Sequence, residues 1–249
     1  MAKSSGLLEK LIFNGVDISG DVGSLSRIGS SSAVLDVTAI DKPAFERILA
    51  HTDGEINFNS FFNDATAQQH VTLKTPFGGG NDIATWLHGS ALGGVSAAIV
   101  AKQVNYDPTR GTDGSLVMNT QLLGAANGLD FTTQLTAGLR TDTAATEGSS
   151  VDFAAASSLG AAAYLQVTAF SGTDVTMSVQ SSSDNGAGDA FSNIAALVFT
   201  QVTSAPTAER KATSLGASIE RYLRAVTVTT GGVTSVTFSL VVTRSLYAA

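Results

Sequence analysis

Hydrophobic and polar positions alternate along residues 115–123, where Leu116, Met118, Thr120 and Leu122 fall on one face of an extended chain. A period of two predicts a strand with one buried face. Residues 98–104 form a second extended run, apolar and partly β-branched, and the turn formers Asp107-Pro108 and Asp113-Gly114 lie between the two runs. Because proline fixes φ and glycine accepts positive φ, both pairs favour turns. The pattern predicts a long β-hairpin with a wide polar tip at residues 106–114.

The same alternation predicts further strands in the first half of the chain. Within residues 54–62, Ile56, Phe58 and Ser60 alternate with Glu55, Asn57 and Asn59, so one face of this strand is expected to be buried and the other polar. The pair Asn14-Gly15 predicts a tight turn between two short strands in residues 10–19. Three more strands are expected at residues 33–40, 83–88 and 129–136.

Three other segments of the first half lack a strand pattern. Residues 21–32 are rich in glycine and serine and are expected to form a loop. Asp41 with Pro43 predicts the start of a short helix, because aspartate caps helices and proline suits the first turn; its apolar face would hold Phe45, Ile48 and Leu49. A second short helix is expected over residues 64–73, with Asp64 as its cap.

The chain changes character after residue 136. Residues 137–150 are rich in Thr, Ala, Gly and Ser and show no periodicity, which is typical of a linker. Beyond them, short strands at even spacing predict a β-sandwich; they are expected at residues 164–170, 175–180, 197–202, 222–228 and 236–243. We therefore expect a mainly β protein with one or two short helices, divided into residues 1–142, a linker at 143–150, and a C-terminal β-sandwich at 151–249.

Composition and charge exclude several classes of protein. Hydrophobic residues make up 43% of the 249 residues, enough for a packed core, and the net charge is −7. Tight nucleic-acid binding needs clustered Lys and Arg to displace counterions from phosphate, and here 14 basic residues face 21 acidic ones. There is no cysteine, so disulfides and thiolate zinc sites are excluded. The sequence shows no signal peptide or membrane-spanning run, and we expect the chain to fold in the cytoplasm where it is made.

Candidate chemistry in the first half is weak. Gly78, Gly79 and Gly80 are glycine-rich but lack the Gly-Lys-Ser/Thr ending of a phosphate loop. His51 and Asp53 could share a metal, or they could lie in a solvated turn, since no third ligand is near. Three histidines and many serines allow a nucleophile triad in principle, but no Gly-x-Ser-x-Gly elbow supports it. The expectation is a protein that is not an enzyme and has no cofactor.

The second half offers two binding hypotheses. Tyr164, Phe170, Phe191 and Tyr222 could form a sugar-stacking platform, although aromatic residues of a sandwich are more often core. Arg221 and Arg224 share one expected strand and could touch an acidic partner, although a cross-strand ion pair is the more ordinary arrangement.

Several segments together resemble the major tail tube protein of long-tailed, non-contractile bacteriophages, especially those of actinobacteria. The likeness is carried by AVLDVTAIDKPAFERI at residues 33–48, DGEINFNSFFN at 53–63, AKQVNYDPTRGTDGSLVMNTQ at 101–121 and GLDFTTQLTAGLRTDT at 128–143. Residues 163–186 and 221–244 resemble the outer β-sandwich that follows the tube domain in some of these proteins. Two features depart from the family: the helix after the second strand is weakly signalled, and the three glycines at 78–80 stand where a more regular connection is usual.

The resemblance implies a tail-tube β-sandwich or barrel domain at residues 1–142 that forms hexameric rings. Stacked rings would make the tail tube of a virion, a conduit through which the tape measure protein and genomic DNA pass without specific binding. Further implied partners are the tail terminator and the baseplate or distal tail proteins, with no membrane partner. The C-terminal sandwich would decorate the tube exterior, where it could bind host-surface glycans, or act as a spacer.

Polar faces on the expected barrel strands supply candidate residues for this role. Those expected to face the lumen are Asp36, Glu55, Asn57, Asn59, Asn119 and Gln121, and we expect the lumen to be polar or acidic. Residues expected to contact the next ring are Asp107, Arg110 and Asp113 at the hairpin tip; an exposed loop is the alternative for this tip.

Three other classes stay open. A soluble carbohydrate-binding β-sandwich adhesin would expose aromatic residues and remain monomeric. The tube protein of a bacterial secretion or injection system would share the ring but not need the second sandwich. A hydrolase is the most distant alternative, because no triad or carboxylate pair is in place.

Overall fold

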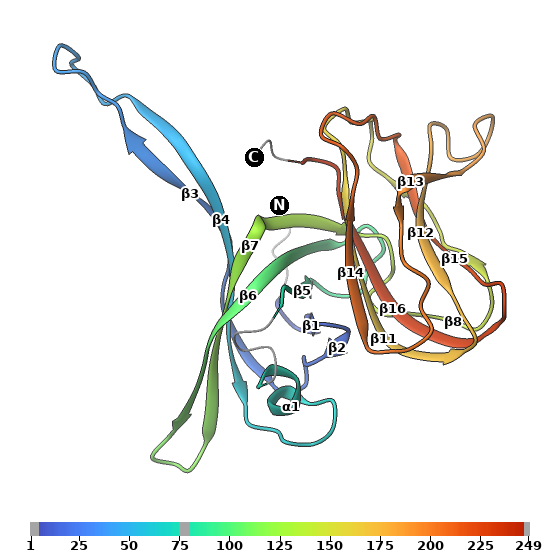
Figure 1. Cartoon of the computed structure of the whole chain (residues 1–249), viewed down its shortest axis with the longest axis horizontal. Coiled ribbons are helices and arrows are strands. Elements are labelled where there is room, and N and C mark those ends of the chain that lie inside the picture. The colour runs from blue at the N-terminus through green and yellow to red at the C-terminus, as the bar shows by residue number, and fades with distance from the viewer. Residues whose placement is uncertain (1–4, 75–79, 247–249) are drawn as a thin grey trace.

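The computed structural model describes residues 5–74 and 80–246, and nearly all of its regular structure is antiparallel β-sheet. One short helix, α1 (Gln69–Leu73), occurs among the described residues. The mainly β expectation is therefore confirmed. The strands of a single chain leave an open sheet and do not close into a barrel (Figure 1).

The first half of the chain forms one side of a large sheet. Two short strands, β1 (Lys10–Phe13) and β2 (Val16–Asp17), meet at the predicted turn, in which Asn14 and Gly15 both have positive φ. β1 pairs with β5 (Asp82–Leu87), which pairs with β6 (Val95–Arg110), which pairs with β7 (Leu116–Gln134). β4 (Arg47–Phe61) lies on the other side of β7 and pairs with β3 (Val22–Asp36).

The strands β3 and β4 are each 15 residues long and form an arm that projects from the rest of the molecule (Figure 1). The loop expected at residues 21–32 is wrong, because this serine-rich stretch pairs with β4 over its length, and Ser26 and Ser30 donate hydrogen bonds to β4 carbonyls. The helix expected from Asp41 is also wrong. Residues 37–46 form the tip of the arm, in which Thr38 Oγ1 accepts a hydrogen bond from the Glu46 amide.

The predicted long hairpin is present as β6 and β7, but its tip is narrower than expected. The strands stay paired out to Arg110 and Leu116, which leaves residues 111–115 as the turn. Pro108 belongs to the paired part of β6 and lies opposite Met118. It is tolerated there because β5 begins at Asp82, opposite Ala101, and beyond that point the far side of β6 has no neighbouring strand in the part of the chain that the structure describes.

Two smaller expectations need correction. Residues 129–136 were expected as a separate strand, but most of them belong to β7, which is interrupted by an irregular stretch at residues 125–128 where Ala126 and Gly128 have positive φ. The helix expected over residues 64–73 is reduced to α1, and its cap is Gln68 without a side-chain hydrogen bond, not Asp64. The strand expected at residues 83–88 is confirmed as β5. Of the glycine run, Gly78 and Gly79 lie outside the described residues.

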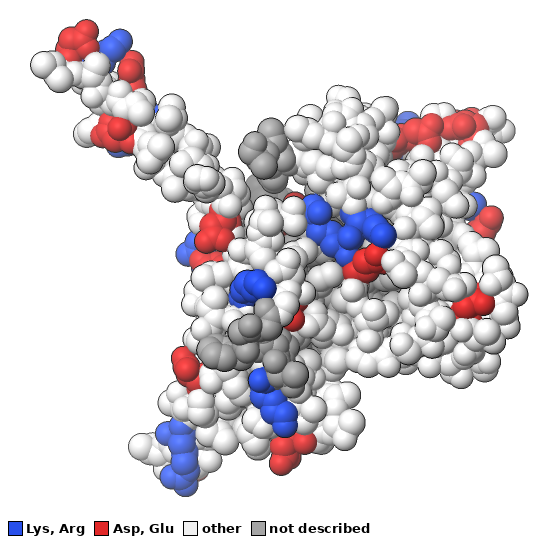
Figure 2. Space-filling view, in the orientation of Figure 1, with Lys and Arg blue, Asp and Glu red and all other residues white. Residues whose placement is uncertain are grey.

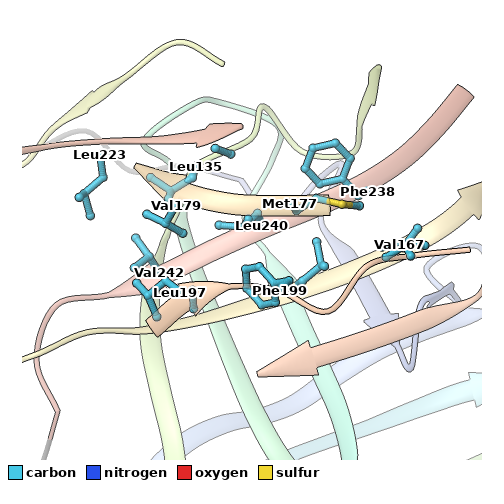
Figure 3. Close-up of a cluster of buried hydrophobic side chains, with 14 of the residues drawn as sticks. Leu135, Val167, Met177, Val179, Leu197, Phe199, Leu223, Phe238, Leu240 and Val242 are labelled. Carbon is cyan, nitrogen blue, oxygen red and sulfur yellow. The ribbon is translucent and has the colours of Figure 1, made fainter. Parts of the chain in front are cut away.

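The second half extends the large sheet and adds a smaller one facing it. The large sheet gains β8 (Arg140–Asp142), β11 (Ala162–Gly172), β14 (Thr207–Ala212) and β16 (Val233–Thr243). The smaller sheet holds β9 (Thr146–Glu147), β10 (Val151–Asp152), β12 (Thr176–Ser182), β13 (Ser192–Val198) and β15 (Tyr222–Val228). Between them lies an apolar core that includes Met177, Leu197, Phe199, Phe238 and Leu240 (Figure 3). The β-sandwich is confirmed, with the strand expected at residues 197–202 placed earlier, at β13.

The two halves share a sheet and a core. β16 pairs with β7 through Val241 opposite Gln134, and a common apolar cluster joins Ile12, Ile83, Leu87, Ala98 and Val100 to Ala162, Tyr164 and Val241. The side chain of Gln166 accepts a hydrogen bond from the Gly15 amide and donates to Ile83 O and Thr85. The division of the chain at residues 143–150 into separate domains stays a prediction.

Candidate assembly surfaces

Five of the six residues expected to face a lumen lie together on one face of the sheet. Asn57 is paired with Gln121 and Asn59 with Asn119, while Glu55 lies opposite Leu123. The neighbouring strand adds Asn105 opposite Gln121. These side chains share a face because the strands are in register and side chains alternate with a period of two.

Amide groups dominate this polar face. A hollow of about 210 Å³ on this face is lined by Ser26, Asn57, Phe58, Asn59, Asn105, Asn119, Thr120 and Gln121. Asn105 Oδ1 accepts a 2.6 Å hydrogen bond from the Gln121 amide, and the side-chain amide of Asn105 donates to Asp107 at 3.2 Å. The face can therefore both donate and accept hydrogen bonds along its length.

The carboxylate of Glu55 is neutralised within this face. It forms an ion pair with Arg27 on β3, and it accepts hydrogen bonds from Asn57 Nδ2 at 2.6 Å and Gln121 Nε2 at 3.4 Å. A basic side chain in contact with the Glu55 carboxylate cancels much of the field of that carboxylate. The face is therefore polar, and its acids are Glu55, paired with Arg27, and Asp107, which accepts a hydrogen bond from Asn105. That this face lines a lumen stays a prediction.

Asp36 is not part of this group. It lies on the arm opposite Arg47, eight residues along β4 from Glu55, which corresponds to about 26 Å at the usual rise of a strand. Its carboxylate accepts hydrogen bonds from the backbone amide and hydroxyl of Thr38, and these bonds hold its pKa below the ordinary value.

The three residues expected to contact a neighbouring ring occupy two different places. Asp107 lies within paired β6 opposite Asn119, next to the amide face. Arg110 ends β6, and Asp113 lies in the turn, where it accepts hydrogen bonds from the amide and hydroxyl of Ser115 at 3.0 and 2.7 Å. These bonds lower the pKa of Asp113. Only Arg110 and Asp113 are therefore at the tip.

The sheet that carries the amide face has two open edges. Among the described residues, β3 pairs only with β4, and β6 beyond Ala101 pairs only with β7. The order β3-β4-β7-β6 therefore has one unpaired strand edge at each end. Unpaired edges of this length present free backbone donors and acceptors. The sequence missed the β3 edge because its serines and glycines indicated a loop.

The arm exposes an unusual number of large apolar side chains. They are Val34, Leu35, Val37, Ile40, Phe45, Ile48 and Leu49, and Ile40 at the tip is fully exposed. Figure 2 shows charged side chains of both signs at the outer end of the arm; Arg47 there stacks on the Phe45 ring, 4.7 Å from its centroid. A two-stranded ribbon is marginal by itself in water, so this surface is suited to being covered by another molecule.

The aromatic residues considered for sugar stacking do not form a platform. Tyr164 is fully buried. The guanidinium carbon of Arg224 lies 4.2 Å from the centroid of the Phe191 ring. The guanidinium carbon of Arg221 lies 4.8 Å from the centroid of the Tyr222 ring. Because guanidinium groups already occupy these ring faces, a sugar would have to displace them.

Arg221 and Arg224 are both engaged within the chain. Arg221 donates two hydrogen bonds of 2.7 and 2.6 Å to Asp152, and this bidentate contact lowers the pKa of Asp152 to about 2. Arg224 pairs with Glu147 at 2.9 Å and donates to Gln180. The cross-strand ion pair is thus the arrangement that the structure contains.

The remaining candidates do not gather into a chemical site. His51 and Asp53 are on the arm, and Asp53 Oδ1 accepts a hydrogen bond from the adjacent Gly54 amide. In residues 5–74 and 80–246 there is no group of three His, Cys, Asp or Glu side chains placed to hold a metal ion. Over the same residues, no helix is both long and apolar enough to span a membrane.

No protein-family model and no curated protein matches the chain. Among solved structures, the chain is similar to a protein of the native gene transfer agent virion, with 16% identity, a TM-score of 0.40, and coverage of 52% of this chain and 98% of that one. It is also similar to SPP1 Dit, from the hub adsorption apparatus of phages infecting Gram-positive hosts, with 11% identity, a TM-score of 0.31, and coverage of 93% and 98%. A chain of the activated phage p2 baseplate shows 7% identity, a TM-score of 0.37, and coverage of 96% and 99%. TM-scores this low do not assign the chain to a family.

Proposed function

We propose that the chain is a structural subunit of a phage tail tube, in which six copies form a ring and rings stack into a conduit for genome delivery. The observation that carries the proposal is the four-stranded unit β3-β4-β7-β6, which has a polar face, an apolar face and two long open edges. This arrangement agrees with the tail-tube resemblance of residues 33–63 and 101–143.

Ring closure pairs the two open edges with each other. The free edge of β6 in one copy would lie beside the free edge of β3 in the next, which continues the sheet from copy to copy. A head-to-tail contact of this kind stays finite only when the rotation closes. Closure into a shared barrel removes the edges, which would otherwise favour aggregation.

The amide face lines the lumen in this proposal, with Glu55, Asn57, Asn59, Asn119 and Gln121 pointing inward. DNA carries about one charge per 1.7 Å of axis and binds tightly to basic surfaces through counterion release. A surface of amides with a compensated Glu55–Arg27 pair offers no such attraction, and DNA or the tape measure protein can pass without being held. Asp36, on the arm, would lie outside this central zone.

Stacking uses the two ends of the same unit. The register of β4 places the arm at its Arg47 end and the β6–β7 tip beyond its Phe61 end, so the two project in opposite directions (Figure 1). We infer that the apolar arm of one ring is covered by the adjacent ring, with Arg110 and Asp113 of the tip at the opposite ring face. The tail terminator and the baseplate or distal tail proteins would cover the terminal rings.

The C-terminal sandwich lies outside the tube in this arrangement. Its role is a spacer or stabiliser that decorates the exterior, and its aromatic residues give little support to glycan binding because Arg221 and Arg224 cover two of the rings. Weak glycan binding by many copies would still gain from avidity, and a glycan array on assembled tubes would detect it.

Negative-stain electron microscopy of the purified protein across a concentration series tests the proposal. Stacked rings with a central channel are expected. An arm-deleted variant sharpens the test: residues 32–52 are replaced by Asn-Gly, which joins the directly paired Ser31 and Asp53 through a two-residue hairpin turn. We expect this variant to form single rings that do not stack. Uniform monomers at every concentration, for the intact chain, would favour the adhesin alternative.

A further inference from the structure

The two free edges of the unit β3-β4-β7-β6 carry opposite charges on the amide face. Between Val22 and Leu35, Arg27 is the only charged residue of β3, and it lies opposite Asn57 of the amide face. In β6 beyond Val104, Asp107 is the only charged residue on this face, because Arg110 lies an odd number of residues further along and falls on the other face. A base therefore lies at one edge and an acid at the other.

Both charged groups have capacity for a further partner. The side chain of Arg27 is 51% exposed and forms an ion pair with Glu55, but Arg27 has no other ion pair or hydrogen bond within residues 5–74 and 80–246. A guanidinium group has five N–H donors. Asp107 is exposed, accepts one hydrogen bond from Asn105 at 3.2 Å and has no basic partner in the same part of the chain.

The register within the sheet fixes the positions of the two charges relative to each other. Directly paired residues form rows that cross the four strands from β3 to β6. Two successive rows on the amide face read Arg27, Asn57, Gln121, Asn105 and Ser24, Asn59, Asn119, Asp107. The acid and the base thus lie at opposite ends of neighbouring rows.

Ring closure would bring these two ends together. Three antiparallel pairings separate β3 from β6, so the two strands run in opposite directions within one copy. Rotation about a ring axis preserves the direction of each strand along that axis, and β6 of one copy would therefore pair antiparallel with β3 of the next. A closed barrel needs a stagger between strands, and only an even stagger keeps the amide faces on one side.

We propose that Arg27 of one copy forms an ion pair with Asp107 of the next copy, and that this pair sets the register of ring closure. A stagger of two residues places Asp107 directly opposite Arg27, where the row alone would place it opposite Ser24. The guanidinium then lies between two carboxylates, Glu55 of its own chain and Asp107 of the neighbour, and arginine suits such shared contacts. This inference rests on the proposed ring and adds the contact that joins its copies.

Two single variants, Asp107→Arg and Arg27→Glu, test the pair by mixing. In either variant alone, every contact between copies places like charges together, so the protein concentration for half-maximal ring formation should rise at least about tenfold. In an equimolar mixture, each contact between unlike copies restores opposite charges. We expect rings of alternating copies near the wild-type concentration, and native mass spectrometry should find equal numbers of the two variants in each ring.

Glu55→Gln is the control for the ion pair within the chain, and it is expected to form rings as the wild type does. Asp107→Asn removes the charge without adding another and should raise the half-maximal concentration by about threefold; it decides the matter if a charge-reversed variant fails to fold, which thermal unfolding detects. Mixing has no effect on a defect that is confined to one subunit, so rescue in the mixture identifies a contact between copies.

The outcomes separate this inference from the proposed function. Wild-type rings together with unchanged ring formation by Asp107→Asn, or by either charge-reversed variant, would overturn the ion pair and leave the ring standing. Folded charge-reversed variants that stay without rings when mixed would do the same. Absence of rings from the wild type at every concentration would overturn the proposed function and the ion pair with it.

Discussion

The hydroxyl of Tyr164 donates a 2.5 Å hydrogen bond to the carboxylate of Asp130 at the junction of the two halves of the molecule. Tyr164 lies on β11 and Asp130 on β7, and Arg210 of β14 donates to the same hydroxyl at 3.0 Å. The three side chains form a buried network in which the tyrosine links the acid to the base. Burial raises the pKa of Tyr164, and the adjacent Asp130 carboxylate adds to that shift.

Removing this hydroxyl is expected to destabilise the junction. Tyr164→Phe leaves Asp130 buried with a distant Arg210, whose Nη2 is 4.0 Å away, so the free energy of unfolding should fall by about 1–3 kcal/mol. Urea denaturation measures the loss. A double-mutant cycle with Asp130→Asn isolates the coupling between the two groups, and additive losses would show that they do not act together.

The protonation of Asp130 should make the free energy of unfolding depend on pH. Burial raises its pKa above 3.8, so the native state binds the proton more tightly than the unfolded chain does. Stability from this group is fully present below the unfolded pKa and is lost as pH rises through the native pKa. The free energy of unfolding of the wild type minus that of Asp130→Asn should therefore fall over this interval. A flat difference would contradict the raised pKa.

A glycine at the β1–β2 turn provides a local test of the same junction. Gly15 has φ of +80°, and a Cβ built on it would lie 2.5 Å from Thr207 N and 2.6 Å from Val167 O. Gly15→Ala is expected to lower the free energy of unfolding by about 1–3 kcal/mol through backbone strain and displacement of the second half. Gly20→Ala is the control, because nothing lies within 4 Å of its Cβ position; thermal unfolding compares the two.

Edge pairing between copies can be tested with cysteines, since the chain contains none. Double variants with one cysteine on the free edge of β3 and one on that of β6, such as Ser26→Cys with Val104→Cys, are expected to give a ladder of disulfide-linked species that ends at six. Moving the β3 cysteine to other positions along the strand identifies the register in which β3 and β6 of neighbouring copies pair. Variants with both cysteines on β3 should not give this ladder, and its absence from every β3–β6 combination would reject the ring closure.

Shortening the hairpin tip tests its role in stacking. A chain lacking residues 107–113 is expected to be soluble and to form no stacked tubes, because it loses the end of the sheet that the proposed arrangement places against the next ring. Light scattering during concentration distinguishes polymerising from non-polymerising protein. Tubes of normal length from this variant would reject the role of Arg110 and Asp113.

Periodicity in the sequence predicted the parts of the fold where one strand face is buried. Residues 54–62 and 115–123 alternate cleanly, and the same alternation placed Asn57 opposite Gln121 on one polar face. The loop at residues 21–32 and the helix from Asp41 were wrong, and the strand expected at residues 33–40 is present only as far as Asp36, because the arm has little core to impose a period. In the arm, the hydroxyls of Ser26 and Ser30 donate hydrogen bonds to carbonyls of β4, which is distant in sequence. Asp41 and Pro43, which predicted the start of a helix, lie in the turn at the tip of the arm.

Sequence reasoning could not predict the Arg27–Glu55 ion pair or the hydrogen bonds of Tyr164 with Asp130 and Arg210. The reason differs from that for the arm. Arg27 lies in the stretch assigned to a loop, so its register with β4 was unknown. Arg210 lies on β14, a strand of mixed polarity (TAERKA) that gave no alternation. Contacts between strands distant in sequence depend on pairing, and no local pattern encodes which strands pair.

The irregular stretch at residues 125–128 divides β7 into two paired parts. The strand runs from the hairpin tip at Leu116, past the amide face, to Gln134, where β16 of the outer sandwich is attached. Lying along the 16-residue β6, it spans roughly 50 Å, and its two halves are joined by the left-handed residues Ala126 and Gly128. Because Gln166 and the Tyr164–Asp130 hydrogen bond also tie the two halves together, a change of angle at residues 125–128 would have to displace the second half together with β1 and β5, and we expect the two halves to move as one unit.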